Sequence, residues 1–139
     1  MPQPSLYDRV GGMPFFERLV DCFYDGIRDD EVVGPMYRRD EADPTLAGPR
    51  RRLTLFLVQY WGGPTTYLKE RGHPRLRARH AQFPIDEAAR DRWLAHMRAA
   101  LEASGAGPAE REELLRYMAL AADAMLNAGR ADDEGQRSR

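Results

Sequence analysis

The fold class predicted from this sequence is all-α, and three observations lead to it. Apolar residues recur every three or four positions through most of the 139-residue chain, which is the period of an amphipathic helix. Proline and glycine stand where these stripes begin and end. No stretch alternates apolar and polar residues convincingly, as a half-buried strand does.

The first half of the chain predicts two long helices preceded by a short one. Ser5 and Asp8 resemble a capping box that opens the short helix, and a glycine pair ends it. Pro14 favours the start of the first long helix, whose stripe extends to about residue 28. The second long helix is expected to begin near Pro49, after a polar, turn-rich stretch. Its predicted inner line is Leu53, Phe56, Leu57 and Tyr60.

A segment rich in proline and glycine separates these helices from the next pair. The prolines and glycines of residues 64–84 allow only short segments of regular structure. The best candidate is a helix of one or two turns from Pro74 to about His80. Loops of this length in a folded domain are usually functional or disordered. Residues 61–84 are therefore where a site is expected.

Two further long helices complete the predicted domain. One starts at Asp86 or Glu87, and the other is led by Pro108 after a glycine-rich turn. The last residues, 129–139, are polar and small, and a flexible tail is expected there. Residues 1–128 are expected to form a single domain.

Charge and cysteine content exclude several classes of function. Lys+Arg 21 against Asp+Glu 22 gives a net charge of -1, so an overall basic field for nucleic acid is absent. The one cysteine, Cys22, cannot form an intrachain disulfide, which suits a reducing compartment. No apolar run reaches the roughly 18–20 residues that span a bilayer, and no secretory signal pattern is seen. A cytoplasmic protein without an integral membrane segment is expected.

Four side chains raise the question of a ligand. His80 ends the predicted short helix, and taken alone it is either a packing residue or a metal ligand. Tyr24, Tyr37 and Trp93 each combine a polar tip with a neighbouring apolar stripe. They are either core aromatics with backbone partners or donors that converge on a ligand pocket. His73 and His96 are expected to be a turn residue and a surface or rim residue.

Arginine dominates the positive charges and leaves two interpretations open. Arg52 borders the apolar face of the second long helix, and Arg79 directly precedes His80. Both suit a carboxylate at the mouth of an apolar slot. Clustered arginines are more often solvated, and because the chain has one lysine, arginine is its general surface cation. Solvation is the preferred interpretation for Arg50, Arg51, Arg75 and Arg77.

Several segments are together similar to the truncated haemoglobins, specifically their group II branch. The segments read FYDGI, VVGPMY, RLTLFLVQYWGGPTTYLKERGHPRLRARHAQF and RDRWLAHM. The resemblance extends from about Leu6 to Asn127. It implies a truncated globin-like two-over-two helical sandwich around haem b (iron protoporphyrin IX), with a very short proximal helix.

The resemblance also implies roles for individual residues. His80 falls on the proximal iron ligand, and Tyr24, Tyr37 and Trp93 fall on the distal side, where they would stabilise a bound ligand. The cofactor contacts expected with them are Arg52, Leu53, Phe56, Tyr67, Leu76, Arg79 and Trp93, of which Arg52, Tyr67 and Arg79 would hold the haem propionates.

This sequence departs from the branch in two places. Pro49 stands four residues before Leu53, where the branch usually carries a small residue such as alanine. It adds bulk at a gate for the ligand and offers no hydrogen bond, so the rate of access is in question. The segment between Tyr37 and Leu46 is also a few residues longer than usual.

The function expected from the resemblance is high-affinity binding of O2, NO or CO. Such binding would serve nitric oxide dioxygenation, peroxidase-like oxidation by peroxide, or oxygen binding and delivery. The redox reactions would need an external reductase, and a homo-oligomer is an open alternative to a monomer. The rival hypothesis is a haem-free helical sensor or interaction module, with the arginine-rich residues 71–79 as an anion-binding face.

Overall fold

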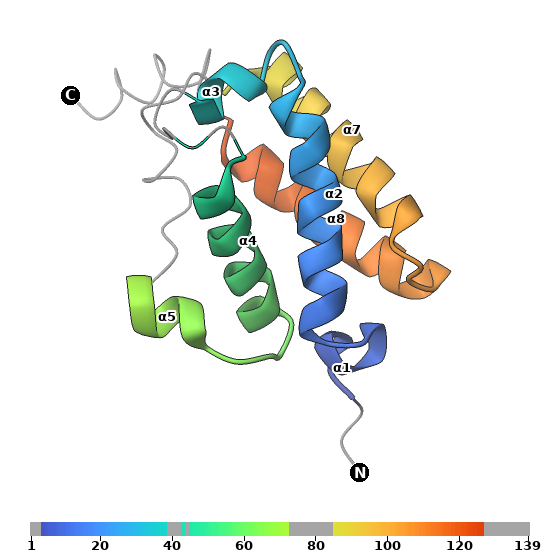
Figure 1. Cartoon of the computed structure of the whole chain (residues 1–139). Coiled ribbons are helices and arrows are strands. Elements are labelled where there is room, and N and C mark those ends of the chain that lie inside the picture. The colour runs from blue at the N-terminus through green and yellow to red at the C-terminus, as the bar shows by residue number, and fades with distance from the viewer. Residues whose placement is uncertain (1–3, 39–42, 44, 73–84, 127–139) are drawn as a thin grey trace, which may run out of the picture.

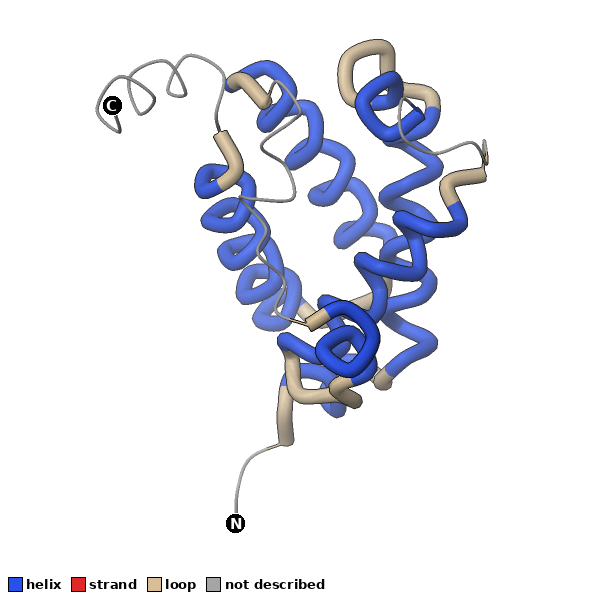
Figure 2. The backbone as a smooth tube through the Cα atoms, turned by 90° about the vertical axis from the view of Figure 1, so that its left-hand side faces the viewer, coloured by secondary structure: helices blue, strands red, loops and turns tan. Residues whose placement is uncertain are grey.

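The structure is a computed structural model, and it describes residues 4–38, 43, 45–72 and 85–126. Every regular element among these residues is a helix, as Figure 2 shows. The helices in chain order are α1 (Leu6–Val10), α2 (Met13–Arg28), α3 (Gly34–Arg38), α4 (Ala47–Tyr60), α5 (Thr66–Arg71), α7 (Glu87–Ala103) and α8 (Pro108–Ala124). The all-α prediction is confirmed.

The four long helices form two layers of two. α2 packs beside α4, and α7 packs beside α8. Contacts between α2 and α7 join the two layers (Figure 1). The core lies between them and contains the fully buried side chains of Phe16, Leu19, Phe23, Ile27, Leu57, Met97, Leu101, Leu114 and Met118. This arrangement is the expected two-over-two sandwich.

Local capping signals account for most of the helix boundaries. The Ser5 hydroxyl accepts a hydrogen bond from the Asp8 N–H at 3.2 Å and so caps α1, as expected. Gly11 ends α1 with a φ of +103°, a left-handed conformation that favours glycine. Asp86 caps α7 by accepting from the Ala89 N–H at 2.8 Å. The helix starts predicted near Pro14, Asp86 and Pro108 are confirmed.

The bounds of α4 agree with the prediction, but one residue of its expected inner line does not. The helix begins at Ala47, so Pro49 is its third residue, where a backbone N–H would have no partner inside the helix. At the other end Tyr60 is 51% exposed, and its expected place on the inner line is wrong. Its ring instead stacks on Tyr117 of α8, with 4.0 Å between the ring centroids.

The short helix α5 was not predicted as a separate element. Its six residues include a single buried apolar side chain, Tyr67, so no stripe can be recognised in the sequence. Tertiary contact explains its position: the Gln59 side chain of α4 accepts a hydrogen bond from the Leu68 N–H at 2.8 Å.

Two expectations lie outside the described residues. These are the short helix from Pro74 to His80 and the tail of residues 129–139. None of the helices that the structure describes has the length and apolar character needed to cross a membrane.

Candidate functional site

Three helices bring Tyr24, Tyr37 and Trp93 together at the α3 end of the molecule. Tyr24 lies on α2, Tyr37 on α3 and Trp93 on α7. The Trp93 indole Nε1–H donates a hydrogen bond to the Tyr37 hydroxyl oxygen at 3.3 Å. The rings of Tyr24 and Tyr37 meet edge to face, with centroids 5.2 Å apart. The three residues are called the distal trio below.

Phe23 holds the distal trio against the core. Its fully buried ring lies edge to face with Trp93 and with Tyr24, at centroid distances of 5.0 Å in both cases. Edge-to-face pairs contribute beyond the burial of their surface, by about 0.5–1.5 kcal/mol. Trp93 is therefore oriented by aromatic packing as well as by its hydrogen bond.

Burial keeps both tyrosines in their protonated form. It raises the pKa of Tyr24 well above its ordinary value, and it also raises the pKa of Tyr37. The hydrogen bond between the two hydroxyls raises the pKa of Tyr24 further and opposes the rise at Tyr37. Both phenols are thus hydrogen-bond donors at physiological pH.

The Tyr37 hydroxyl is hydrogen-bonded to both other members of the distal trio. Its oxygen accepts the Trp93 indole N–H, and it shares a hydrogen bond with the Tyr24 hydroxyl. A phenol also carries one proton of its own to donate. The two phenols carry two protons and one hydrogen bond joins them, so one phenolic proton of the pair remains available to a ligand.

Four residues expected to contact the cofactor lie on α4 and α5. Arg52 and Leu53 are half-buried on α4, and Phe56 is buried one turn further on. The buried ring of Tyr67 on α5 packs against Phe56, with centroids 5.7 Å apart. The guanidinium of Arg50, two residues before Arg52, lies 5.9 Å from the centre of the Tyr24 ring, which places this part of α4 near the distal trio.

The proximal half of the expected site lies outside the described residues, namely Leu76, Arg79 and His80. His96 is the only histidine in the described part of the chain. Its side chain is 27% exposed, and its Nε2 lies 2.7 Å from the Asp30 carboxylate. The expectation of a surface or rim residue did not include this contact with Asp30. No group of three or more histidine, cysteine or acidic side chains among the described residues could hold a metal ion.

Arg50 is a structural residue that the sequence did not reveal. The preferred interpretation as a solvated cation is wrong, because its side chain is only 16% exposed. Its guanidinium donates to Asp25 at 2.8 Å, to Asp21 at 3.2 Å and to the Thr45 carbonyl at 2.7 Å. It also lies 5.9 Å from the centre of the Tyr24 ring. Since arginine is this chain's general cation, no sequence signal distinguished Arg50.

Replacing Arg50 by methionine is expected to lower the free energy of unfolding by about 1.5–3 kcal/mol, the usual contribution of hydrogen bonds to a charged group. Methionine keeps much of the apolar stem but removes the guanidinium donors by which Arg50 joins α4 to α2. Urea unfolding followed by circular dichroism measures the change. Arg51→Met is the matched control, because the Arg51 pair with Glu70 is largely exposed and its loss should change the free energy of unfolding much less. Equal losses in the two variants would contradict the role given to Arg50.

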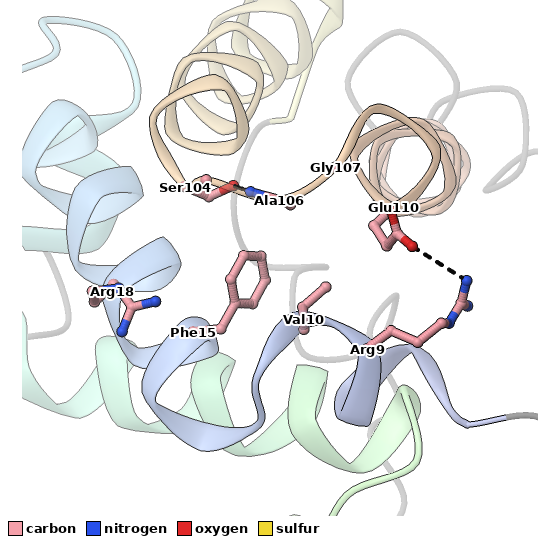
Figure 3. A pocket seen from close by; sticks show the side chains of 9 residues that line it. Arg9, Val10, Phe15, Arg18, Ser104, Ala106, Gly107 and Glu110 are labelled. Atoms are coloured by element: carbon pink, nitrogen blue, oxygen red, sulfur yellow. Dashed lines mark hydrogen bonds and ion pairs between the residues drawn. The ribbon is translucent and has the colours of Figure 1, made fainter.

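A separate pocket lies at the opposite end of α2. It has a volume of about 380 Å³ and is lined by α1, the start of α2 and the turn between α7 and α8 (Figure 3). Arg9 and Glu110 form an ion pair at 3.6 Å on its wall. None of the residues selected from the sequence lines it.

Comparisons with known proteins agree with this arrangement. A sequence profile described as "Bacterial-like globin" matches residues 5–127. The Group 2 truncated hemoglobin YjbI of Bacillus subtilis (strain 168) is 37% identical over 127 residues, which cover 91% of this chain and 92% of that protein.

Solved structures give the same result. A thermostable hemoglobin from the actinobacterium Thermobifida fusca has 45% sequence identity and a TM-score of 0.83, covering 89% of this chain and 98% of its own. The group II truncated hemoglobin from Bacillus anthracis has 34% identity and a TM-score of 0.85, with coverages of 92% and 95%. The chain therefore belongs to the bacterial-like globin family, and within that family to the group II truncated haemoglobins.

Proposed function

We propose that this globin binds O2, and also NO and CO, tightly on the distal side of a haem b whose iron is held by His80. Members of the family bind haem b, which supplies reversible binding and redox chemistry of diatomic gases. The observation that carries the proposal is the hydrogen bonding of Tyr37. Its oxygen accepts the Trp93 indole N–H, and the single hydrogen bond that it shares with the Tyr24 hydroxyl leaves one of the two phenolic protons to donate to the ligand.

The described residues fit this cofactor on its distal side. The distal trio brings together three hydrogen-bonding side chains from α2, α3 and α7. Leu53 and Phe56 on α4 supply apolar surface for a flat, largely apolar ring. Arg52 and Tyr67 have side chains suited to bind carboxylates such as the propionates. His80 and Arg79 complete the proposed site from the sequence resemblance.

Donors fixed around the ligand should slow its release. A hydrogen bond to a charged group is worth about 1.5–3 kcal/mol, so each donor that acts on a polarised ligand slows dissociation by about 10- to 100-fold. Slow release is poorly suited to bulk transport. It favours nitric oxide dioxygenation or peroxidase-like oxidation over oxygen delivery, with an external reductase as electron donor. A cytoplasmic location suits such a partner, and the subunits could also associate as homo-oligomers.

An absorption spectrum of the purified protein tests the proposal at its first step. A Soret band that responds to dithionite and to carbon monoxide is expected. A colourless protein whose binding to anions falls steeply with salt would instead support the haem-free interaction module. The family assignment already removes the basis of that alternative.

Trp93→Phe is expected to accelerate O2 release at least severalfold, because phenylalanine keeps the aromatic contact with Phe23 and removes the indole donor. Stopped-flow measurement of the O2 dissociation rate gives the result. Trp61→Phe is the matched control, since the buried Trp61 Nε1 has no hydrogen-bond partner among the described residues. An unchanged rate in Trp93→Phe would refute the role given to Trp93.

A further inference from the structure

The turn between α2 and α3 is fastened to α7 by Asp30. One carboxylate oxygen accepts the backbone N–H of Val32 at 2.7 Å and that of Val33 at 3.1 Å. The same oxygen lies 3.2 Å from Arg92 Nη1, and the other oxygen lies 2.7 Å from His96 Nε2. The Asp30 side chain is only 7% exposed. A single buried carboxylate therefore orders the turn and binds it to a neighbouring helix.

The two elements joined by Asp30 carry the two ends of the distal hydrogen bond. The turn leads directly into α3, which holds Tyr37, and α7 holds Trp93. Arg92 and His96 flank Trp93 in sequence, one residue before it and three residues after it. Residues three apart on a helix are neighbours on its surface, so the contact that holds His96 also holds the part of α7 that carries Trp93. A shift of the turn relative to α7 would change the distance between the Trp93 nitrogen and the Tyr37 oxygen.

Gly26 provides the space in which the His96 ring lies. A Cβ atom at position 26 would come within 2.5 Å of His96 Nδ1, which is closer than real contacts allow. Glycine inside a helix is unfavourable relative to alanine. Its presence here permits α2 and α7 to approach so closely that the imidazole is held between Gly26 and the Asp30 carboxylate.

The hydrogen bonds also keep Asp30 ionised. Burial alone would raise the pKa of this carboxyl group, but the donors from His96, Val32, Val33 and Arg92 outweigh it and hold the pKa well below its usual range. The acceptor therefore persists throughout the physiological pH range. In neutral histidine a carboxylate partner favours the tautomer with its proton on Nε2.

We propose that Asp30, Arg92 and His96 form a clasp that positions Tyr37 and Trp93 for the distal ligand. None of the three has to touch the ligand, so they are positioning residues. The proposal rests on the proposed function, in which Tyr37 and Trp93 act on that ligand. Its physical basis is the fixed spacing that the clasp imposes between α3 and α7.

His96→Leu and His96→Gln form the central test. Leucine fills space but removes the donor, whereas the glutamine amide places an N–H near the former Nε2. With carbon monoxide as bound probe, His96→Leu should shift or split the C–O infrared band, and the O2 dissociation rate should rise by about 3- to 10-fold. His96→Gln should restore the parent band and rate. Equal behaviour of the two variants would contradict the clasp, because a general packing role predicts no rescue.

The indole N–H resonances report on the clasp directly. The chain has two tryptophans, so ¹H–¹⁵N spectra of the carbon monoxide complex contain two indole signals. In His96→Leu the Trp93 signal should move, while the Trp61 signal stays in place. Gly26→Ala should also move the Trp93 signal, because it displaces the imidazole without deleting it. Since alanine favours the helix, this second variant remains informative if His96→Leu folds poorly.

Arg92→Gln tests the outer contact of the clasp, with Arg98→Gln as its control. Arg92 is 48% exposed, so its loss should have a smaller effect than His96→Leu, and exposed Arg98 on the same helix should have none.

If Trp93→Phe and Tyr37→Phe alter the infrared band but His96→Leu does not, the clasp is wrong and the proposed function stands. If neither Trp93→Phe nor Tyr37→Phe alters the infrared band, the proposed function fails. The Trp93 indole signal still decides the clasp in that case: movement supports it, and no movement overturns it.

Discussion

His80→Ala is expected to lose the absorption spectrum of histidine-ligated haem. The proximal histidine is the protein's bond to iron in the globins, and a methyl group cannot replace it. Visible spectra of the ferrous protein, alone and with carbon monoxide, measure the loss. Added imidazole should restore part of the spectrum, because it supplies the missing ligand without repairing the chain.

The other two histidines are the controls for this substitution. His73→Ala should keep the parent spectrum, and so should His96→Gln, since His96 is engaged with Asp30. A parent-like ferrous spectrum in His80→Ala would show that His80 is not the ligand. Loss of the spectrum in His73→Ala with retention in His80→Ala would move the assignment to His73.

Tyr37→Phe is expected to release O2 about 10- to 100-fold faster than the parent, as loss of a hydrogen bond to a charged group implies. The substitution removes a hydroxyl donor for the ligand, and the same hydroxyl accepts from Trp93 and shares a hydrogen bond with Tyr24. Stopped-flow mixing of the oxygenated protein with carbon monoxide or dithionite gives the dissociation rate.

Tyr7→Phe is the control for Tyr37→Phe. Tyr7 is half-buried on α1, at the other end of the molecule from α3 (Figure 1), and its ring stacks with Phe16. The O2 dissociation rate of this variant should match that of the parent. If Tyr37→Phe also matched it, the donor to the ligand would have to be sought at Tyr24 or Trp93.

Helix positions were predictable because their signals are local. A serine or aspartate cap, a first-turn proline and a terminal glycine each act within one turn of the chain, and α1, α2, α7 and α8 begin or end on such residues. The apolar stripes identified most of the core for the same reason. α5 escaped prediction because one buried tyrosine in six residues forms no period.

The candidate site was predictable only in part. The polar-tipped aromatics stood out individually, yet the sequence alone did not separate core packing from a ligand pocket for Tyr24, Tyr37 and Trp93. The resemblance to the truncated haemoglobins supplied that distinction. The structure adds the hydrogen bonds that join the three residues, with the Tyr37 hydroxyl between Trp93 and Tyr24. Because one hydrogen bond joins the two phenols, one phenolic proton is free for a ligand.

The sequence by itself determined the all-helical class, the long helices and the family to which the chain belongs, because these follow from residue type and spacing along the chain. Tertiary structure decided how far Arg50 is covered and which residue His96 contacts. Arg50 and Arg51 are neighbours of the same type, but only Arg50 faces α2, and His96 meets Asp30 from a separate helix. Such differences depend on how helices distant in sequence pack, and no local pattern records that packing.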